Sequence, residues 1–457
     1  MHGTRNLQFT PRLRKAALGG VGVLTLAVLV AGCTSGNTST TTSTSSGPAT
    51  TQATDAPITV WVDADRAAAA DAYKAAFPND PITVETYDGG ANGSGTFRTK
   101  MQLFDTAGSG WPDVMFSTQN NDASWASQGS NGNKPFAAVL NTGAIPDATI
   151  SGFAKGALDP CTVDGKVYCL RNDLAQVVLW YNKTLMDQFG YTVPTTWEEY
   201  QALGEKVAKE HPGYIVGTQG DTFTSEIYMW SSKCEANHIT GATSVTVKTD
   251  STECKRMASL LDDLRTAGSS PNIGVFTPEF VSTYAGKVLM MPGPIWYSGA
   301  IFNNPSSLNV PAGQMAVAAP LPWKGEDAVT GDVGGATWFI SSHSANPALA
   351  AKFVEFVTTN DAYQVDLAPG YPAFAAAADK WVAKQNSSGY YATPLDQAVA
   401  AGSLIWSGWG SGVFSQEAIW GKTMTTGVAD GKTLVQLLPD WQKAIADQAQ
   451  VDGYTVK

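Results

Sequence analysis

Charged residues and histidines are scarce in this chain, and enzyme signatures are missing. Charged residues make up 15% of the 457 positions, and acidic residues outnumber basic ones by 40 to 29, which argues against a nucleic-acid-binding surface. The 4 histidines are scattered along the sequence, and neither GxSxG nor HExxH occurs. The usual signatures of serine and zinc hydrolases are therefore absent, and we expect no metal and no cofactor.

Basic residues followed by a short apolar run begin the chain. Four arginines and lysines lie within the first 15 positions, and the apolar segment 16–30 leads into the string Leu-Val-Ala-Gly-Cys at 29–33. This order is typical of an export signal. The string resembles the lipobox of bacterial lipoproteins, which implies cleavage after residue 32 and a lipid on Cys33. The alternative is a spanning signal anchor, but the run is shorter than the roughly 20 residues that a span needs.

Small and polar residues fill the segment that follows Cys33. Thr, Ser, Gly, Ala, Asn, Gln and Pro make up almost all of 34–54, a composition that cannot bury a core. We predict a signal peptide at 1–32, a tether at 33–55 and a folded body from residue 56 onward. The signal carries four basic and no acidic residues, so its removal makes the exported chain more acidic.

Four cysteines remain after Cys33, and an even number in an exported chain indicates disulfides. Three pairings are possible, of which proximity in the sequence favours Cys161 with Cys169 and Cys234 with Cys254. Neither pair has CxxC spacing, so a redox or zinc role is not expected.

Strands and helices alternate at the start of the folded body. Residues 58–62, 82–87 and 112–117 are rich in β-branched and apolar residues, and the segments 65–77 and 96–107 between them favour helices. A β-α-β-α-β order predicts a mostly parallel sheet with helices on both faces. Ligands of such sheets bind beyond the carboxyl ends of the strands, which here carry Asp63 and the segment 119–125.

Three stretches together resemble family 1 extracellular solute-binding proteins of ABC importers. Residues 170–210 contain YNK and then PTTWEE, a helix start with Thr195 or Thr196 as N-cap. GKVLMMPGPIWYSG at 286–299 resembles a second family segment, and 315–358 resembles the family's strand, Pro-bearing crossover, Gly-rich strand and ANPALAAKFVEFV helix.

The resemblance implies an α/β fold of two discontinuous lobes, typical of periplasmic binding proteins, joined by a three-crossing hinge. By position the crossings are expected near 171–174, 318–322 and 367–372. Lobe 1 is then 56–170 plus 320–368, and lobe 2 is 171–319 plus 369–457. The ligand would close the lobes by contacting both.

Ligand contacts are predicted where the local pattern matches the family. Amides suit sugar hydroxyls because each both donates and accepts hydrogen bonds. Asp122 is an alternative where Asn120 replaces the family's carboxylate, and Trp338 is expected in the core. Aromatic residues are plentiful, with 14 Trp, 15 Tyr and 17 Phe, and some are expected to stack on sugar rings. The predicted contacts are Asp63, Gln119, Asn120, Asn121, Trp125, Asp173, Asp221, Phe223, Trp230, Trp296, Tyr297, Gly335, Tyr371 and Trp409.

The sequence as a whole predicts a monomeric, lipid-anchored binding protein on the outer face of the cytoplasmic membrane. It would capture a sugar, in particular an oligosaccharide, in an aromatic cleft and deliver it to the transmembrane subunits of an ABC permease. Two alternatives stay open at this point. One is a binder of a polyol or short peptide, and the other is a surface glycosidase, since 40 acidic residues always offer a carboxylate pair.

Overall fold

The computed structural model describes residues 55–87, 93–129, 134–241 and 243–457, without the side chains of 93–95. The predicted signal peptide, Cys33 and all but the last residue of the tether lie outside these residues. Within the described ranges, no helix is both long enough and apolar enough to cross a bilayer.

A five-stranded sheet contains the strands expected near the start of the folded body. β1 pairs in parallel with both β2 and β3, which confirms the β-α-β-α-β order. The fourth strand comes from much later in the sequence and runs antiparallel to both of its neighbours, so the sheet is mixed. In spatial order the strands are β2 (Ile82–Thr86), β1 (Ile58–Val62), β3 (Val114–Ser117), β13 (Thr337–Ile340) and β6 (Leu170–Arg171).

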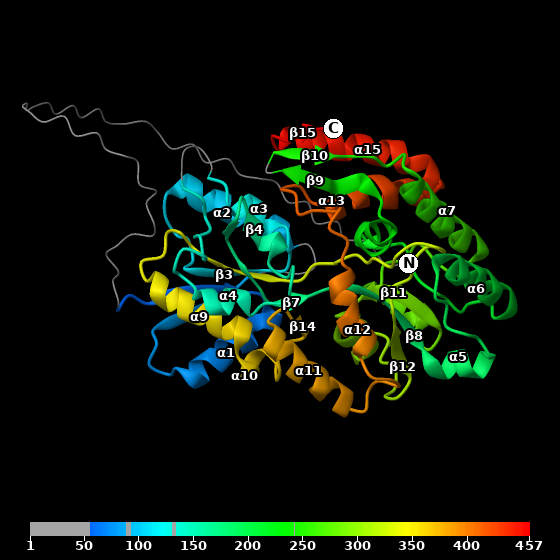
Figure 1. Ribbon diagram of the computed structural model, residues 1–457, viewed down its shortest axis with the longest axis horizontal. Helices are drawn as coiled ribbons and strands as arrows, with labels where there is room; N and C mark the ends of the chain where they lie inside the picture. Colours follow the sequence, from blue (N-terminus) through cyan, green and yellow to red (C-terminus); the bar gives the residue numbers. More distant parts are fainter. Residues whose placement is uncertain (1–54, 88–92, 130–133, 242) are drawn as a thin grey trace, which may run out of the picture. The chain divides into compact units, whose positions relative to one another are not determined.

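Helices α1 (Ala67–Ala76) and α9 (Pro347–Thr359) pack against each other beside this sheet (Figure 1). Tyr73 of α1 is buried, and its ring centroid lies 4.9 Å from that of Phe353 and 5.4 Å from that of Phe356 in α9. The small alanines of α1 let these rings approach. The second helix of the expected order, α2 (Gly93–Ala107), leads into β3.

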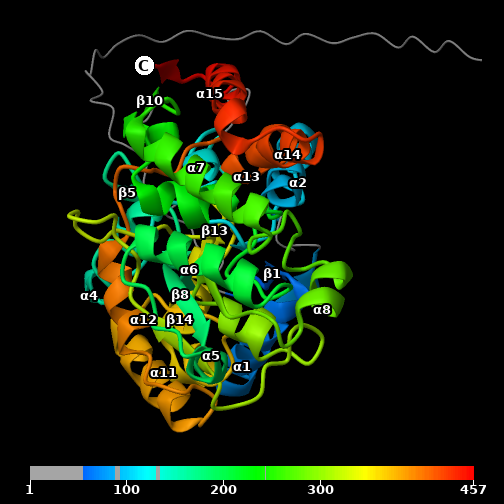
Figure 2. The ribbon, with the colours of Figure 1, turned by 90° about the vertical axis from the view of Figure 1, so that its right-hand side faces the viewer.

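A second, antiparallel sheet has β8 (Val177–Asn182) between β11 (Met290–Pro294) and β12 (Met315–Ala318). After β8 come α5 (Lys183–Phe189) and α6 (Trp197–Glu210), and α6 packs against α7 (Thr252–Ala267) (Figure 2). The Thr196 hydroxyl accepts a hydrogen bond from the Glu199 N–H at 3.2 Å, and two glutamates lie in the first turn. The predicted N-terminus of α6 is thus confirmed.

Three segments of the described chain pass between the parts built around the two sheets. The first runs through β7 (Asp173–Leu174), which pairs with β14 (Tyr371–Pro372) on the third. On the second segment, the Pro322 carbonyl accepts a hydrogen bond from the Trp197 N–H of α6. The chain reaches the first sheet only where the Ala336 carbonyl accepts from Asn172.

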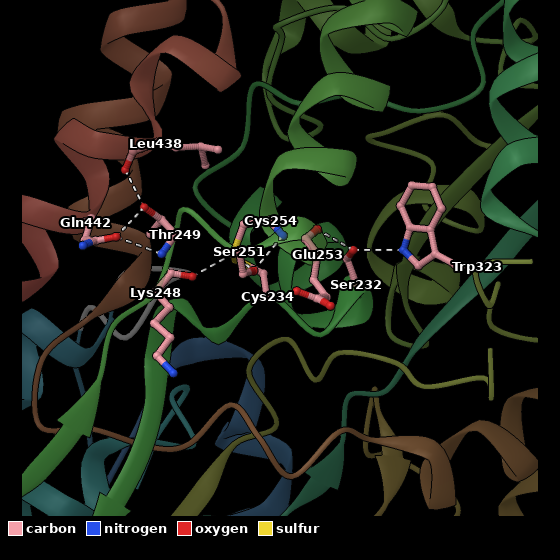
Figure 3. Close-up of a disulfide and its surroundings, with 10 residues drawn as sticks. All are labelled: Ser232, Cys234, Lys248, Thr249, Ser251, Glu253, Cys254, Trp323, Leu438 and Gln442. Carbon is pink, nitrogen blue, oxygen red and sulfur yellow. Dashed lines mark hydrogen bonds between the residues drawn. A yellow bond between two sulfur atoms is a disulfide. The ribbon is translucent and has the colours of Figure 1, made fainter. Parts of the chain in front are cut away.

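Both disulfides have the pairing expected from proximity in the sequence. Cys161 bonds to Cys169, and Cys234 bonds to Cys254 in the first turn of α7. Figure 3 shows that the second disulfide lies close to Thr249, whose hydroxyl donates to the Leu438 carbonyl of α15 (Leu434–Val451) at 2.8 Å. This region also holds a small sheet of β9 (His238–Gly241), β10 (Ser244–Thr246) and β15 (Thr455–Val456).

Candidate functional site

A cavity lies where the loop after β3 meets segments between β8 and β11 and a later segment at 409–417. Its empty volume is about 270 Å³, including space open to solvent. Asn120 and Asn121 reach it from the loop after β3, at the carboxyl end of that strand, where ligands of α/β sheets bind. The other walls come from η3 (Ser225–Met229), η5 (Glu235–Asn237), the loop after residue 408 and α13 (Gln416–Trp420). The lining residues are Asn120, Asn121, Glu226, Trp230, Asn237, Trp409, Gly410, Ser411, Gly412, Phe414, Gln416 and Glu417.

Two tryptophans form an aromatic wall of the cavity. The rings of Trp230 and Trp409 are 5.4 Å apart at their centroids and nearly parallel, with an angle of 10°. The indole N–H of Trp230 donates to the Trp406 carbonyl at 2.8 Å, which fixes the ring in place. Both tryptophans were predicted from the sequence, and the structure brings them together with Asn120 and Asn121.

The amide groups of the cavity are held by protein acceptors. Asn120 Nδ2 donates to Asp332 Oδ2 at 3.3 Å, and Asn121 Nδ2 donates to the Phe414 carbonyl at 3.3 Å. On the opposite wall, Asn237 Nδ2 donates to the Gly410 carbonyl at 2.8 Å, and its Oδ1 accepts from Gln416 Nε2 at 3.1 Å. Every side-chain amide on the wall therefore has a fixed orientation.

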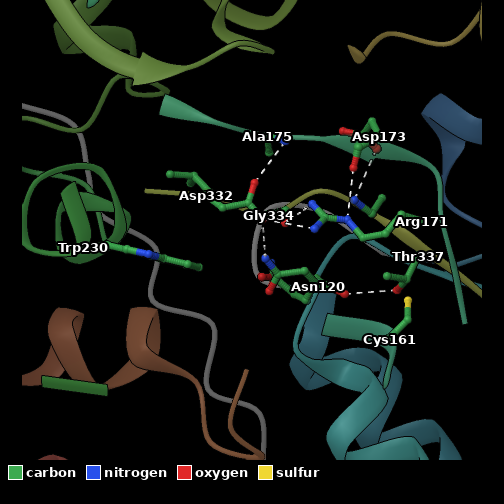
Figure 4. A network of polar contacts seen from close by, with 12 residues as sticks. Asn120, Cys161, Arg171, Asp173, Ala175, Trp230, Asp332, Gly334 and Thr337 are labelled. Carbon is green, nitrogen blue, oxygen red and sulfur yellow. Dashed lines mark hydrogen bonds and ion pairs between the residues drawn. The ribbon is translucent and has the colours of Figure 1, made fainter. Parts of the chain in front are cut away.

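A buried ion pair supports the cavity from behind (Figure 4). Asp332 accepts from Arg171 Nη1 at 3.1 Å and from the Ala175 N–H at 3.1 Å, in addition to its bond with Asn120. Arg171 is 1% exposed, so its charge has little access to water. The network thus joins the loop after β3 to the two segments on which the chain passes between the sheets.

Gly335 makes room for this arginine. Its φ is +78°, and a Cβ at this position would lie 1.6 Å from Arg171 Nη2. The sequence predicts close backbone approach at Gly335, and the group that approaches in the structure is a guanidinium.

Two carboxyl groups face each other on the cavity wall. Glu226 of η3 is 6% exposed, and Glu417 of α13 lies within hydrogen-bonding reach of it. Burial, followed by the charges of Glu417 and Asp332, raises the pKa of Glu226 well above its usual range. Glu417 Oε2 accepts from the Ser415 hydroxyl at 2.6 Å, whereas Glu226 Oε2 has no donor among the described residues.

Three predicted aromatic residues form a second group away from the cavity lining. Trp296 donates from Nε1 to the Val333 carbonyl at 2.8 Å, on the segment that runs to the first sheet. Its ring contacts those of Phe223 and Tyr297 edge-on, and it is nearly parallel to that of Phe276, which is 51% exposed. Trp296 itself is partly exposed, so this group offers a second aromatic surface.

Asp221 lies near this second group, and burial raises the pKa of its carboxyl to about 6. The Val275 N–H donates to it, which opposes the shift. Since the folded pKa lies above the ordinary value of 3.8, the folded state binds more protons between about pH 4 and 6. The contribution of Asp221 to stability is therefore present below pH 4 and is lost as the pH rises through 6.

Asp221→Asn should consequently gain stability relative to the parent protein as the pH rises from 4 to 7. The gain is of the order of 3 kcal/mol at most, from about two pKa units at 1.36 kcal/mol each. Urea unfolding at both pH values measures it. The exposed Asp187→Asn is the control and should show little difference between the two pH values. If the free energies of unfolding of Asp221→Asn and the parent protein differ by the same amount at both pH values, the predicted titration of Asp221 is contradicted.

The other predicted site residues do not line the cavity. Asp63 caps the turn after β1 by accepting from Arg66, and Asp173 accepts from Asn172 and Ala336. Trp125 packs edge-on against Phe97, and Tyr371 packs against Trp381. Gln119 is buried, and its carbonyl accepts from Thr337. The alternative Asp122 pairs with Arg98, and Trp338 is buried in the core as expected.

Sequence reasoning missed the charged residues of the site. Asp332, Glu226, Glu417 and Arg171 carry the charges at and behind the cavity, and none was singled out. Asp332 lies only two residues before the glycine pair 334–335, and Glu226 lies between the predicted residues Phe223 and Trp230. For Asp332 and Glu226, the only signal in the sequence was that they lie close to residues already predicted for the site.

Side chains on both sides of β3 also donate hydrogen bonds to backbone carbonyls of the loop that carries Trp409. Ser124 Oγ donates to the Ser411 carbonyl, Asn121 to Phe414 and Arg98 Nη1 to Val413. We call these three contacts the clasp. The clasp joins residues on both sides of β3 to the loop that carries Trp409.

A family model described as bacterial extracellular solute-binding protein matches residues 58–364, more than half of the chain. The chain belongs to this family. A curated relative is the arabinooligosaccharide-binding protein of Halalkalibacterium halodurans, 23% identical over 226 residues. That match covers 47% of this chain and 48% of the relative, so it spans about half the length of that protein.

Solved structures of sugar-binding proteins have the same fold. The galacto-N-biose/lacto-N-biose I-binding protein of an ABC transporter from Bifidobacterium longum, in complex with lacto-N-biose, has a TM-score of 0.73 at 18% identity. The match covers 89% of this chain and all of that one. A binding protein from B. animalis subsp. lactis, in complex with β-1,6-galactobiose, has a TM-score of 0.71 at 22% identity, with 88% and 99% covered. The fold is thus the two-lobed α/β fold predicted from the sequence.

Proposed function

We propose that this protein is the substrate-binding lipoprotein of an ABC importer and that it captures an oligosaccharide in the cavity between its lobes. The observation that carries the proposal is the cavity itself, in which two parallel tryptophans face amide side chains from the other part of the fold. Flat rings pack on the apolar faces of sugars while polar groups bind the hydroxyls at their edges. The sugar complexes of the related structures support the same ligand class.

We propose that the lobes are organised around the two larger sheets. Lobe 1 would be 56–170 plus about 336–368, and lobe 2 would be 171–335 plus 369–457, with one boundary later than the sequence suggested. The cavity takes residues from both lobes, so a bound ligand favours the closed state. The clasp would open to admit the ligand and form again around it. The importer's permease would recognise the closed, loaded form.

A thermal-shift screen of the purified protein against a carbohydrate panel tests the proposed ligand class. A ligand that binds only the folded state raises the melting temperature with concentration. At least one oligosaccharide is expected to do so, and its incubation with the protein should leave it intact. Released products would favour a glycosidase, and shifts by polyols or short peptides alone would favour another solute class.

The lipid anchor has a separate test. Cys33→Ala should release the protein from the membrane fraction or block its processing, because the predicted lipid attachment site is lost. Ligand affinity should stay unchanged, since the change lies outside the folded body. Membrane association in the absence of Cys33 would contradict the anchor and leave the proposed ligand unaffected.

A further inference from the structure

The wall of the cavity offers acceptors of hydrogen bonds. All four of its side-chain amides already donate to protein oxygens, and their orientations are fixed because those oxygens can only accept. Trp230 Nε1 is used in the same way. Three buried oxygens are left without a donor among the described residues, and they are Asn121 Oδ1, Gln416 Oε1 and Glu226 Oε2. Donor groups on a ligand would satisfy these three oxygens.

The wall is also acidic. Its lining within the described chain includes Glu226 and Glu417 but no lysine, arginine or histidine. Neither glutamate forms an ion pair in the described residues, whereas the nearby Asp332 is compensated by Arg171 at 3.1 Å. Hydroxyl groups of a neutral sugar would supply donors but no positive charge. Burial of two carboxyl groups without a cation is costly, and a ligand cation would relieve that cost.

Protein metal sites are often built from three or more His, Cys, Asp or Glu side chains. Among the described residues, no group of three or more His, Cys, Asp or Glu side chains has an arrangement that could hold one. An ammonium group needs only oxygen acceptors, and it is also favoured near the faces of tryptophan rings. The parallel rings of Trp230 and Trp409 lie on the same wall.

We propose that the ligand carries a free amino group on a sugar ring and that its ammonium binds between Glu226 and Glu417. The sugar ring then packs on Trp409, and the oxygens of Asn121 and Gln416 accept from its hydroxyls. This inference rests on the proposed capture of a sugar and narrows it to amino sugars.

Protons balance in a simple way. In the empty site, burial and then the charges of Glu417 and Asp332 raise the pKa of Glu226 well above its usual range, which favours its protonated form. The ammonium brings its own N–H donors to both groups. A proton held by Glu226 then leaves to solvent as the ammonium binds.

Matched pairs of sugars test the proposal by titration calorimetry at pH 7. The pairs are glucosamine with glucose, galactosamine with galactose, and deacetylated chitobiose with cellobiose, and N-acetylated chitobiose is added as a neutral form. Within each pair that binds, the amino sugar is expected to bind at least about tenfold more tightly than the hydroxyl sugar. A tenfold difference in affinity corresponds to about one charge-assisted hydrogen bond. Ethanolamine, an amine without a sugar ring, should not bind.

Glu226→Gln keeps the size of the side chain and removes its charge. The ratio of the affinities for the amino sugar and the hydroxyl sugar should therefore fall close to one. Glu417→Gln is the second variant, in case the first does not fold, and should act in the same direction. Glu235→Gln removes an equal charge from a partly exposed side chain outside the cavity lining and should keep the preference.

The outcomes separate the two proposals. If hydroxyl sugars bind as tightly as their amines, or if Glu226→Gln and Glu417→Gln leave the preference unchanged, the amino-sugar inference fails while sugar capture stands. Binding of ethanolamine would show that the site binds an amine that carries no sugar ring, and this result would also contradict the inference. If no sugar of the pairs or of the wider panel binds, the proposed capture of a sugar fails as well.

Discussion

Trp409→Ala is expected to weaken oligosaccharide binding by at least about 30-fold, or about 2 kcal/mol, as for a central binding residue. Trp409 is 2% exposed, and its ring lies parallel to Trp230 on the cavity wall. Removing it leaves a sugar face without its flat partner and leaves space in the closed site. Titration calorimetry with the best oligosaccharide of the panel measures the loss.

The matched control is Trp111→Ala. Trp111 is partly exposed and stacks on His343 with ring centroids 3.7 Å apart, outside the cavity lining. This variant should keep the affinity of the parent protein. If Trp409→Ala unfolds at a lower temperature but binds as tightly as the parent, Trp409 is a packing residue only.

Asp332→Ala is expected to have the largest effect on stability, a loss of about 3–5 kcal/mol in the free energy of unfolding. The change leaves Arg171, 1% exposed, without its partner carboxylate, and an unpaired buried charge costs this much. It also removes the acceptor of the Ala175 N–H and of Asn120 Nδ2. Chemical denaturation measures the loss from the midpoint and slope of the transition.

Two further variants test whether the loss of stability comes from the unpaired charge of Arg171. The double change Arg171→Met with Asp332→Leu removes both charges and should cost less than Asp332→Ala alone. Asp187→Ala breaks an exposed pair with Lys183 and should cost less than about 1 kcal/mol. A loss below about 1 kcal/mol for Asp332→Ala would contradict the structural importance of the buried pair.

Local patterns predicted the early part of the fold well. The β-branched run at Ile58–Val62, the alanine-rich helix and the cap at Thr196 depend on neighbours in the sequence, and the structure contains all three. The antiparallel direction of β13 depends on a strand more than 200 residues away, at Val114–Ser117. No local pattern carries that information.

The candidate site was predictable only in its aromatic and amide parts. Trp409 lies between two glycines, at 408 and 410, and Asn120 and Asn121 follow the strand predicted at 112–117. Glu226 and Glu417 are two of 40 acidic residues, and 191 positions separate them in the sequence. Only folding shows that these two acids are buried and face each other without a cation.

A crystal structure of the complex with the carbohydrate that gives the largest thermal shift tests the central claim most directly. The account predicts a sugar ring against Trp409, with hydrogen bonds to groups of both lobes, among them Asn121 and Glu226. A sugar bound elsewhere, with the cavity between Trp230 and Asn120 empty, would contradict it.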